Sequence, residues 1–404
     1  MPLHPLIYDW NEVGRSPEPA TPVMLDDETL RDGLQSPSVH TPTIEQKIKI
    51  LHLIDSLGID TADIGLPGAG AHVAGDVERL AKEIADNRLQ VRANCAARTV
   101  AADIRPVVEI AQRTGLEIEC CTFIGSSPIR QYAEDWSLDK LLRLTDEAVR
   151  LAVSEGLPVL YVTEDTTRAD PESLRKLYST AIRAGARRVC IADTVGHATP
   201  AGAAAVVRFV RSVIDECGGG VGIDWHGHRD RDLAVVNSLA AMEAGATRLH
   251  GAAIGIGERV GNTPMDLLLV NLVLMGRRTA DLTRLVEYGE FVSEACGVPI
   301  PPNYPVIGRD AFRTATGVHA SAVIKAFRKH DTALADAVYS GVPASLVGRE
   351  QAIEIGPMSG RSNVVFWLER HGLEATDERV DRIFNEAKKS DAVLSEGEIA
   401  ALLK

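Results

Sequence analysis

The sequence predicts an α/β protein: a (β/α)8 TIM barrel followed by a mainly helical C-terminal extension. Short runs of β-branched and other apolar residues recur about every 30 residues, and a segment with helical periodicity follows each one. We expect eight strands, at residues 23–27, 61–66, 90–95, 117–123, 158–164, 188–193, 222–228 and 248–254. Eight alternating units favour a closed parallel barrel, and an open doubly wound sheet is the competing arrangement.

The segments between the expected strands have one apolar face. Residues 43–58 and 138–156 carry apolar side chains at positions i, i+3, i+4 and i+7, which is typical of a helix packed on a core. Several of these segments end in glycine just before the next strand, where a left-handed C-terminal residue is favoured. These glycines are Gly58, Gly115, Gly156, Gly185 and Gly245.

The chain of 404 residues is longer than a barrel of about 250 residues requires. We expect an N-terminal arm at residues 1–22, the barrel at 23–275 and helical subdomains at 276–404. Residues 276–300 look helical, and two or three further helices are expected before Lys404. We expect no regulatory domain for leucine feedback, because the sequence ends at EIAALLK.

The composition is that of an ordinary globular protein, with 45% hydrophobic residues. A net charge of −13 without a Lys/Arg-rich run argues against nucleic acid as a partner. The six cysteines have no CxxC spacing, which favours reduced thiols. The sequence shows neither a signal peptide nor an apolar run of membrane-spanning length, so we expect a cytoplasmic protein without membrane contacts.

Two local patterns indicate a metal centre. His226 and His228 lie at the end of an apolar strand, and residues two apart on a strand face the same side. In a barrel that side opens into the active site, so both imidazoles can face one divalent cation. The segment 26–35, DDETLRDGLQ, ends the first strand and offers carboxylates to complete the site. Either pattern alone is also compatible with ordinary polar loop residues.

A third pattern, GIGERVGN at residues 255–262, follows the eighth strand. Its glycines are spaced as GxGxxxG, close to the GxGxxG of dinucleotide folds, but it lies at the wrong end of the β/α series for such a fold and lacks the acidic residue on a second strand that such a fold needs. We interpret it as a tight loop near an anionic ligand, with Gly257, Glu258 and Arg259 as the expected cofactor-binding residues.

Taken together, these motifs resemble one family. LRDGLQ (30–35), HGHRDRDLAVVNSLAAMEAG (226–245) and GIGERVGN (255–262), in that order, look like the 2-isopropylmalate and homocitrate synthases. Residues 161–170, 191–200, 312–325 and 338–348 fit as well, so the resemblance covers residues 23 to 404. It implies an acyltransferase that condenses acetyl-CoA with a 2-oxo acid, in a homodimer whose extension crosses to the partner barrel.

The resemblance also implies roles for individual residues. The divalent metal (Zn, Mg or Mn) would be held by Asp32, His226 and His228, with Asn262 as a fourth or indirect ligand. Arg31 would stabilise the alkoxide or enolate, and Thr194 would hydrogen-bond the carboxylate of the substrate. The candidates for deprotonating the acetyl methyl group are Glu164 and His319, assisted by Tyr339.

The sequence departs from the family in the expected substrate pocket. Leu34, Cys121 and Leu160 are apolar or weakly polar where relatives carry polar residues, and homocitrate synthases place an Arg at the position of Leu160. A second substrate carboxylate would need a polar partner, so we expect an apolar 2-oxo acid such as 2-oxoisovalerate or phenylpyruvate. His72, Arg98 and Arg130 could reverse this argument if they reach the pocket.

Three other functions remain open at this stage. The first is a homocitrate synthase that uses 2-oxoglutarate. The second is a carbon–carbon lyase of the hydroxymethylglutaryl-CoA lyase type, which shares the DGLQ motif but carries a Gly-Cys-rich loop that this sequence lacks. The third is a binding protein without activity, which the complete set of expected metal ligands disfavours.

Overall fold

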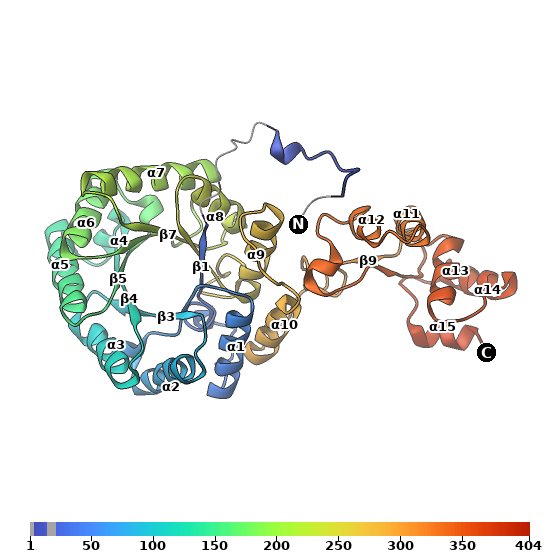
Figure 1. The fold of residues 1–404 in the computed structure, drawn as a ribbon, viewed down its shortest axis with the longest axis horizontal. Coiled ribbons are helices and arrows are strands. Elements are labelled where there is room, and N and C mark those ends of the chain that lie inside the picture. Colours follow the sequence, from blue (N-terminus) through green and yellow to red (C-terminus); the bar gives the residue numbers. More distant parts are fainter. Residues whose placement is uncertain (1–3, 14–21) are drawn as a thin grey trace. The chain divides into compact units, whose positions relative to one another are not determined.

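The computed structural model describes residues 4–13 and 22–404. Strands β1 to β8 form a closed barrel in which consecutive strands pair in parallel and β8 pairs with β1. Figure 1 shows the ring of strands surrounded by helices. The predicted (β/α)8 barrel is confirmed, and the doubly wound alternative is wrong. The strands are β1 (Met24–Asp27), β2 (Thr61–Asp63), β3 (Arg92–Arg98), β4 (Ile118–Gly125), β5 (Val159–Glu164), β6 (Arg188–Asp193), β7 (Gly222–Gly227) and β8 (Arg248–Gly251).

The helices of the barrel begin and end as their sequences indicate. Thr43 caps α1 by accepting a hydrogen bond from the backbone of Gln46, whose side chain accepts one in return. The five glycines expected at left-handed positions all have positive φ, and Gly185, at 114°, ends α6. The helices are α1 (Ile44–Ser56), α2 (Ala71–Asn87), α3 (Ala101–Thr114), α4 (Pro128–Ala133), α5 (Leu138–Ser154), α6 (Pro171–Ala184), α7 (Pro200–Glu216), α8 (Ala234–Glu243), α9 (Met265–Leu274) and α10 (Leu285–Cys296).

Two strands end earlier than the apolar pattern suggests. β2 stops at Asp63, and Gly65 then adopts a φ of 141°, at which a side chain would also meet Val77. β8 stops at Gly251, before the short 3-10 turn of residues 253–255, where Ile254 has a φ of 47°. Apolar residues just after these strands therefore belong to loops at the mouth of the barrel.

The chain divides into two compact units. One takes in residues 22–280 and 287–299, and the other takes in the described residues 4–13, 281–286 and 300–404. Most of α10, which the sequence places in the extension, thus packs with the barrel. Of the expected N-terminal arm, residues 1–3 and 14–21 lie outside the described part of the chain.

The second unit is mainly helical, with one short pair of parallel strands, β9 (Arg313–Thr314) and β10 (Ala352–Ile353). It has five helices between residues 300 and 404, where two or three were expected, because α12 and α15 are too short for a readable periodicity. Its last helices share a core that includes Val364, Leu368 and Ile383. The helices are α11 (Gly317–Arg328), α12 (Thr332–Ala337), α13 (Arg361–Arg370), α14 (Asp377–Ala387) and α15 (Glu396–Leu402).

Two expectations from the composition can be compared with the structure. All six cysteines are free thiols, as their spacing indicates. Over the described ranges, no helix combines the length and the apolar character that crossing a membrane requires.

The interior of the barrel contains ion pairs as well as apolar side chains. Arg248 of β8 is 1% exposed, and its guanidinium lies 2.5 Å from Oδ2 of Asp224 and 2.5 Å from Oε2 of Glu119. A buried carboxylate that loses its cation is strongly destabilising, because water cannot replace the partner. These contacts therefore hold β4, β7 and β8 together across the barrel.

We predict that Arg248→Ala lowers the free energy of unfolding by about 3–5 kcal/mol, because it removes the cation that pairs with Glu119 and one of the cations around the buried Asp224, which Arg188 also contacts. Arg150→Ala is the matched control, since Arg150 pairs with Asp146 on an exposed face of α5. Chemical denaturation followed by circular dichroism measures both. Equal midpoints for the two variants would contradict the role of Arg248.

Candidate active site

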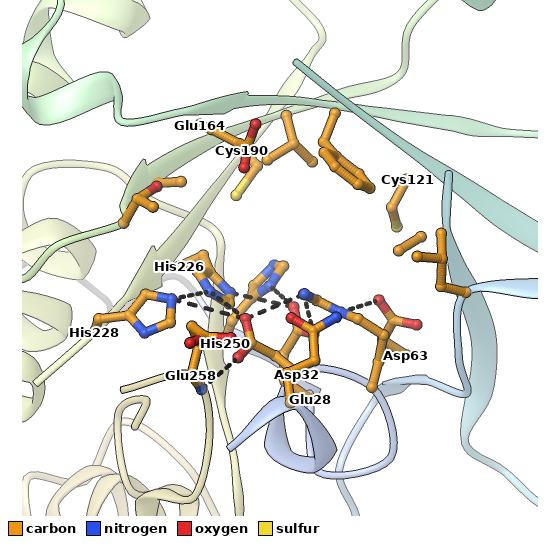
Figure 2. Close-up of a pocket in the computed structure, with 18 of the residues that line it drawn as sticks. Glu28, Asp32, Asp63, Cys121, Glu164, Cys190, His226, His228, His250 and Glu258 are labelled. Atoms are coloured by element: carbon orange, nitrogen blue, oxygen red, sulfur yellow. Dashed lines mark hydrogen bonds and ion pairs between the residues drawn. The ribbon is translucent and has the colours of Figure 1, made fainter. Parts of the chain in front are cut away.

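A cavity opens at the C-terminal ends of the barrel strands (Figure 2). Its wall has two chemically different halves. Side chains on or after β7, β8, β1 and β2 are charged or polar apart from Leu66, whereas side chains from β3 to β6 are mostly apolar up to the rim. The lining residues are Glu28, Arg31, Asp32, Gln35, Asp63, Leu66, Ala96, Cys121, Phe123, Leu160, Val162, Glu164, Cys190, Ala192, Thr194, His226, His228, His250, Glu258 and Arg259.

Three potential metal ligands converge on the polar side of the cavity. Nε2 of His226 lies 3.3 Å from Nε2 of His228, and Oδ2 of Asp32 lies 3.5 Å and 3.7 Å from these two atoms. In a tetrahedral site with bonds of about 2.1 Å, ligand atoms are about 3.4 Å apart. All three side chains are buried, so the triangle fits one divalent cation bound between them.

The protonation of His228 and Asp32 also suits a cation. Burial and the neighbouring His226 lower the pKa of His228 to about 4, so its ring is neutral at pH 7. Burial alone would raise the pKa of Asp32, but Arg31 and the two imidazoles outweigh it and keep this pKa far below its usual range. Nδ1 of His226 lies 3.2 Å from Oε1 of Glu28, an arrangement that leaves Nε2 free to bind a metal.

Asn262 and Gly257 complete the site from the loop after β8. Nδ2 of Asn262 donates to Oδ1 of Asp32 over 3.1 Å, while its buried Oδ1 has no hydrogen-bond partner among the described residues. A Cβ atom at Gly257 would lie 2.1 Å from Nδ2 of Asn262 and 3.1 Å from Oδ1 of Asp32. Only glycine therefore lets the loop approach this closely, and Asn262 has an oxygen left for a ligand.

A second group of potential ligands, formed by Glu28, His226 and His250, suits a metal less well. Both ring nitrogens of His250 already face carboxylates, 2.9 Å from Oε1 of Glu28 and 2.9 Å from Oδ2 of Asp224. Burial would lower the pKa of His250, but the charge of Asp26 and the bonds to Asp224 and Glu28 raise it to about 10. A doubly protonated imidazole has no lone pair for a metal.

Arg31 lies between three carboxylates beside the ligand triangle. Its guanidinium contacts Glu28, reaches Oδ2 of Asp32 over 3.1 Å and donates to Oδ2 of Asp63 over 3.0 Å. Its side chain lines the cavity and is 18% exposed. Burial and the charges of Glu28 and Asp26 raise the pKa of Asp63, although Arg31 opposes them. The cavity thus presents a fixed cation next to the expected metal.

Two polar residues lie at the rim of the apolar half. Oγ1 of Thr194 accepts the backbone N–H of Asp165 over 2.8 Å, so its own proton remains available to an acceptor in the cavity. Figure 2 shows Glu164 across the cavity from His226 and His228. Burial raises the pKa of Glu164 despite the nearby guanidinium groups of Arg130 and Arg31, which suits a group that exchanges protons.

Comparisons with known proteins show the family of the chain. A family model described as HMGL-like matches residues 23–292. The chain belongs to the HMGL-like family. It is 34% identical over 371 residues to a probable 2-isopropylmalate synthase of Methanopyrus kandleri, covering 91% of this chain and 69% of that protein. It is 35% identical over 370 residues to a homocitrate synthase of the same organism, covering 91% of this chain and 87% of that one.

A 2-isopropylmalate synthase of Sulfurisphaera tokodaii is 33% identical over 370 residues, which cover 91% of this chain and 90% of that one. The chain is therefore a member of the group of 2-isopropylmalate and homocitrate synthases within the HMGL-like family, and an enzyme of this condensing acyltransferase kind. The solved structure of an HMG-CoA lyase from Bacillus subtilis matches 70% of this chain and 96% of its own, with a TM-score of 0.57 and 20% identity. A likeness at this identity shows the fold alone.

Most of the site residues expected from the family motifs lie together. Cys121, Leu160, Thr194, Glu258 and Arg259 line the same cavity as the metal ligands. Arg259 is held by Asp230, which it contacts through two nitrogens at 2.8 Å, and it also donates to the carbonyl of Thr194. Gly257 is not part of the lining. A side chain at this position would collide with Asn262 and crowd Asp32, so the loop requires glycine here.

Other expected residues do not line the cavity. Leu34 lies outside the lining, and the adjacent Gln35 takes part instead. His72 is 82% exposed near Asp76, Arg98 is bound to Asp103, and Arg130 is paired with Glu134. His319 and Tyr339 belong to the second compact unit, where their rings stack with centroids 4.1 Å apart.

Sequence reasoning missed several lining residues that a simple rule would have found. Side chains two apart on a strand face the same side. Thr194 therefore implies Ala192 and Cys190, both of which line the cavity. Glu28, Asp63 and His250 also lie at strand ends, but the motifs around them did not suggest which partners they would meet.

We predict that His226→Ala lowers the affinity for a divalent cation by more than about 100-fold, because it removes a direct ligand. Substitution of a residue that only orients the ligands costs about 10- to 100-fold. Calorimetric titration of metal-stripped protein with Zn²⁺ or Mn²⁺ measures this. His52→Ala is the control, since His52 pairs with Glu83 on the outer helices. Unchanged affinity in His226→Ala would rule out this metal site.

Proposed function

We propose that the protein condenses acetyl-CoA with a 2-oxo acid to give a 2-substituted malate and CoA. The observation that carries this proposal is the division of the cavity. One half offers three metal ligands and a cation, and the other offers apolar side chains. A 2-oxo acid has the same division, because its keto and carboxylate oxygens lie at one end and its side chain lies at the other.

The polar half supplies the groups that the condensation needs. Asp32, His226 and His228 would hold the divalent metal, which polarises the ketone when it is bound. Arg31 would stabilise the negative charge that develops on oxygen. From the rim of the other half, the hydroxyl of Thr194 would donate to the substrate carboxylate. The arrangement of these groups before substrate arrives limits the reorganisation that the reaction requires.

Glu164 is the proposed base in the barrel. It would remove a proton from the acetyl methyl group, and the resulting carbanion would form the new C–C bond at the ketone carbon. The ketone oxygen then takes up a proton. Water cleaves the thioester to release CoA as a thiol and the second carboxylate of the product. A raised pKa suits Glu164 for this step, because a stronger base accepts the proton more readily.

The apolar half supports an apolar substrate side chain. Cys121, Leu160 and Cys190 form a buried cluster with Val162 packed against it. Both arginines of the lining already have carboxylate partners, Arg31 with three and Arg259 with Asp230. A second substrate carboxylate placed against this cluster would lose its hydration without gaining a cation, at a cost of several kcal/mol. We therefore favour 2-oxoisovalerate or a bulkier 2-oxo acid such as phenylpyruvate over 2-oxoglutarate.

We predict a higher kcat/KM for 2-oxoisovalerate or phenylpyruvate than for 2-oxoglutarate, because of this apolar wall. The assay follows free CoA thiol with each 2-oxo acid under one set of conditions. As a matched pair of variants, Leu160→Arg should raise the relative activity with 2-oxoglutarate, whereas Leu160→Met should not. Wild-type preference for 2-oxoglutarate would refute the apolar substrate, although not the condensation itself.

His319 and Tyr339 are the proposed contribution of the second unit, in a homodimer whose extension serves the partner barrel. Both side chains are exposed on their own unit and stack on each other, so their polar atoms can meet a ligand from outside it.

We predict that mixing Glu164→Ala subunits with His319→Ala subunits restores part of the activity that each variant lacks, because a mixed dimer contains one complete site. Dissociation and reassociation should precede the assay, and sedimentation should show a dimer. A monomer with full activity would be inconsistent with this arrangement, and failure of exchanged dimers to recover activity would show that each chain serves itself.

A further inference from the structure

A chain of buried hydrogen bonds connects α10 to the end of β1. Tyr288 of α10 is fully buried, and its hydroxyl donates to Oδ2 of Asp27. The same hydroxyl oxygen lies 3.1 Å from Oγ1 of Thr29. Because the proton of Tyr288 is directed to Asp27, the hydroxyl of Thr29 donates to the oxygen of Tyr288. The other carboxylate oxygen of Asp27 accepts the backbone N–H of Thr29 over 2.9 Å.

Thr29 extends this chain to the loop after β8. Its Oγ1 accepts the backbone N–H of Ala253 over 2.9 Å. The next residue of that loop, Ile254, has a φ of 47° and donates its N–H to Asp266 of α9 over 2.7 Å. A β-branched residue in this region is strained and persists only where its surroundings hold it. The loop is therefore held at its start by two side chains outside the cavity.

The two loops that Thr29 joins both carry residues of the proposed metal site. Thr29 precedes Asp32 by three residues, and Ala253 opens the loop that contains Gly257 and Asn262. The loops meet again where Asn262 donates to Oδ1 of Asp32 and the N–H of Glu258 lies 3.3 Å from the same oxygen. There is no free space at this meeting point, because even a Cβ atom at Gly257 would collide.

We propose that Tyr288 is a positioning residue for the metal site. Through Thr29 it sets the spacing of the loops after β1 and β8, and that spacing sets the position of Asp32 against His226 and His228. Tyr288 is neither a metal ligand nor part of the cavity lining. The inference rests on the proposed function, because it assumes that the triangle binds a cation.

If Tyr288 had a purely structural role, its substitution would lower stability without changing metal affinity. Tyr161 provides the comparison. Tyr161 is also fully buried, and its hydroxyl lies 2.8 Å from Oγ1 of Thr145 on α5. It lies on β5 between two residues of the lining, so it points away from the cavity. Replacing either tyrosine with Phe removes one buried hydroxyl, but only Tyr288 is connected to the ligand loops.

The experiment titrates metal-stripped Tyr288→Phe, Tyr161→Phe and wild-type protein with Mn²⁺ and measures thermal stability without metal. We expect an affinity loss of about tenfold or more in Tyr288→Phe, as for other residues that orient metal ligands. We expect wild-type affinity in Tyr161→Phe and similar decreases in Tm for both variants. Equal Mn²⁺ affinity in all three proteins would overturn the inference, even if Tyr288→Phe lost more stability.

Substitutions at Thr29 test the same chain if Tyr288→Phe folds poorly. Thr29→Val keeps the shape but removes the hydroxyl and should reproduce the affinity loss, whereas Thr29→Ser keeps the hydroxyl and should restore affinity. Loss of affinity in Thr29→Ser but not in Thr29→Val would show that the methyl group, and not the hydrogen-bond chain, matters. If the wild-type protein does not bind Mn²⁺, both the proposed metal site and this inference fail. If the wild type binds Mn²⁺ and Tyr288→Phe binds it equally well, only this inference fails.

Discussion

The site depends on a series of buried side chains in which cations and carboxylates alternate. The series runs from the middle of the barrel to one expected metal ligand. Arg248 binds Asp224, Asp224 binds His250, His250 binds Glu28, and Glu28 faces Nδ1 of His226. From Arg248 to Glu28, each group stabilises the ionised form of its neighbour, so none of these four is a buried charge without a partner. The last contact orients His226 so that its other nitrogen points towards Asp32 and His228.

This series also explains why one side of the barrel is so polar. A buried carboxylate such as Asp224 costs several kcal/mol unless cations and hydrogen bonds surround it, so the charged side chains cluster on adjacent strands. The opposite strands are then free to carry Cys121, Leu160 and Cys190. The same separation that lowers the cost of burying charge thus creates a cavity with one polar and one apolar wall.

The loops at the mouth of the barrel are held more tightly than loops usually are. Gly257 has no space for a side chain, Ile254 is strained, and Thr29 bonds to residues on either side of it. Strain of this kind costs about 1–3 kcal/mol and is found where geometry serves function. Here it keeps Asp32 and Asn262 within 3.1 Å of each other, although they come from opposite ends of the barrel sequence.

The sequence by itself determined the order of strands and helices, because periodicity and helix-ending glycines such as Gly185 act locally. It also identified His226 and His228, since two residues two apart on a strand must face one way. It indicated Asp32 and Asn262 only through family motifs, and it placed Leu34 in a lining that contains Gln35 instead, because loop geometry does not follow strand alternation.

Only the tertiary structure decided which side chains meet across the barrel. The contact between Tyr288 and Asp27 joins residues 261 positions apart, and no local pattern indicates such a pair. The same holds for His250, whose neighbours are Glu28, just after β1, and Asp224 on β7. Together they turn an imidazole that resembles a metal ligand into a cation. Local preferences determine the elements, but burial and long-range electrostatics decide what each polar residue does, because both depend on the closed barrel.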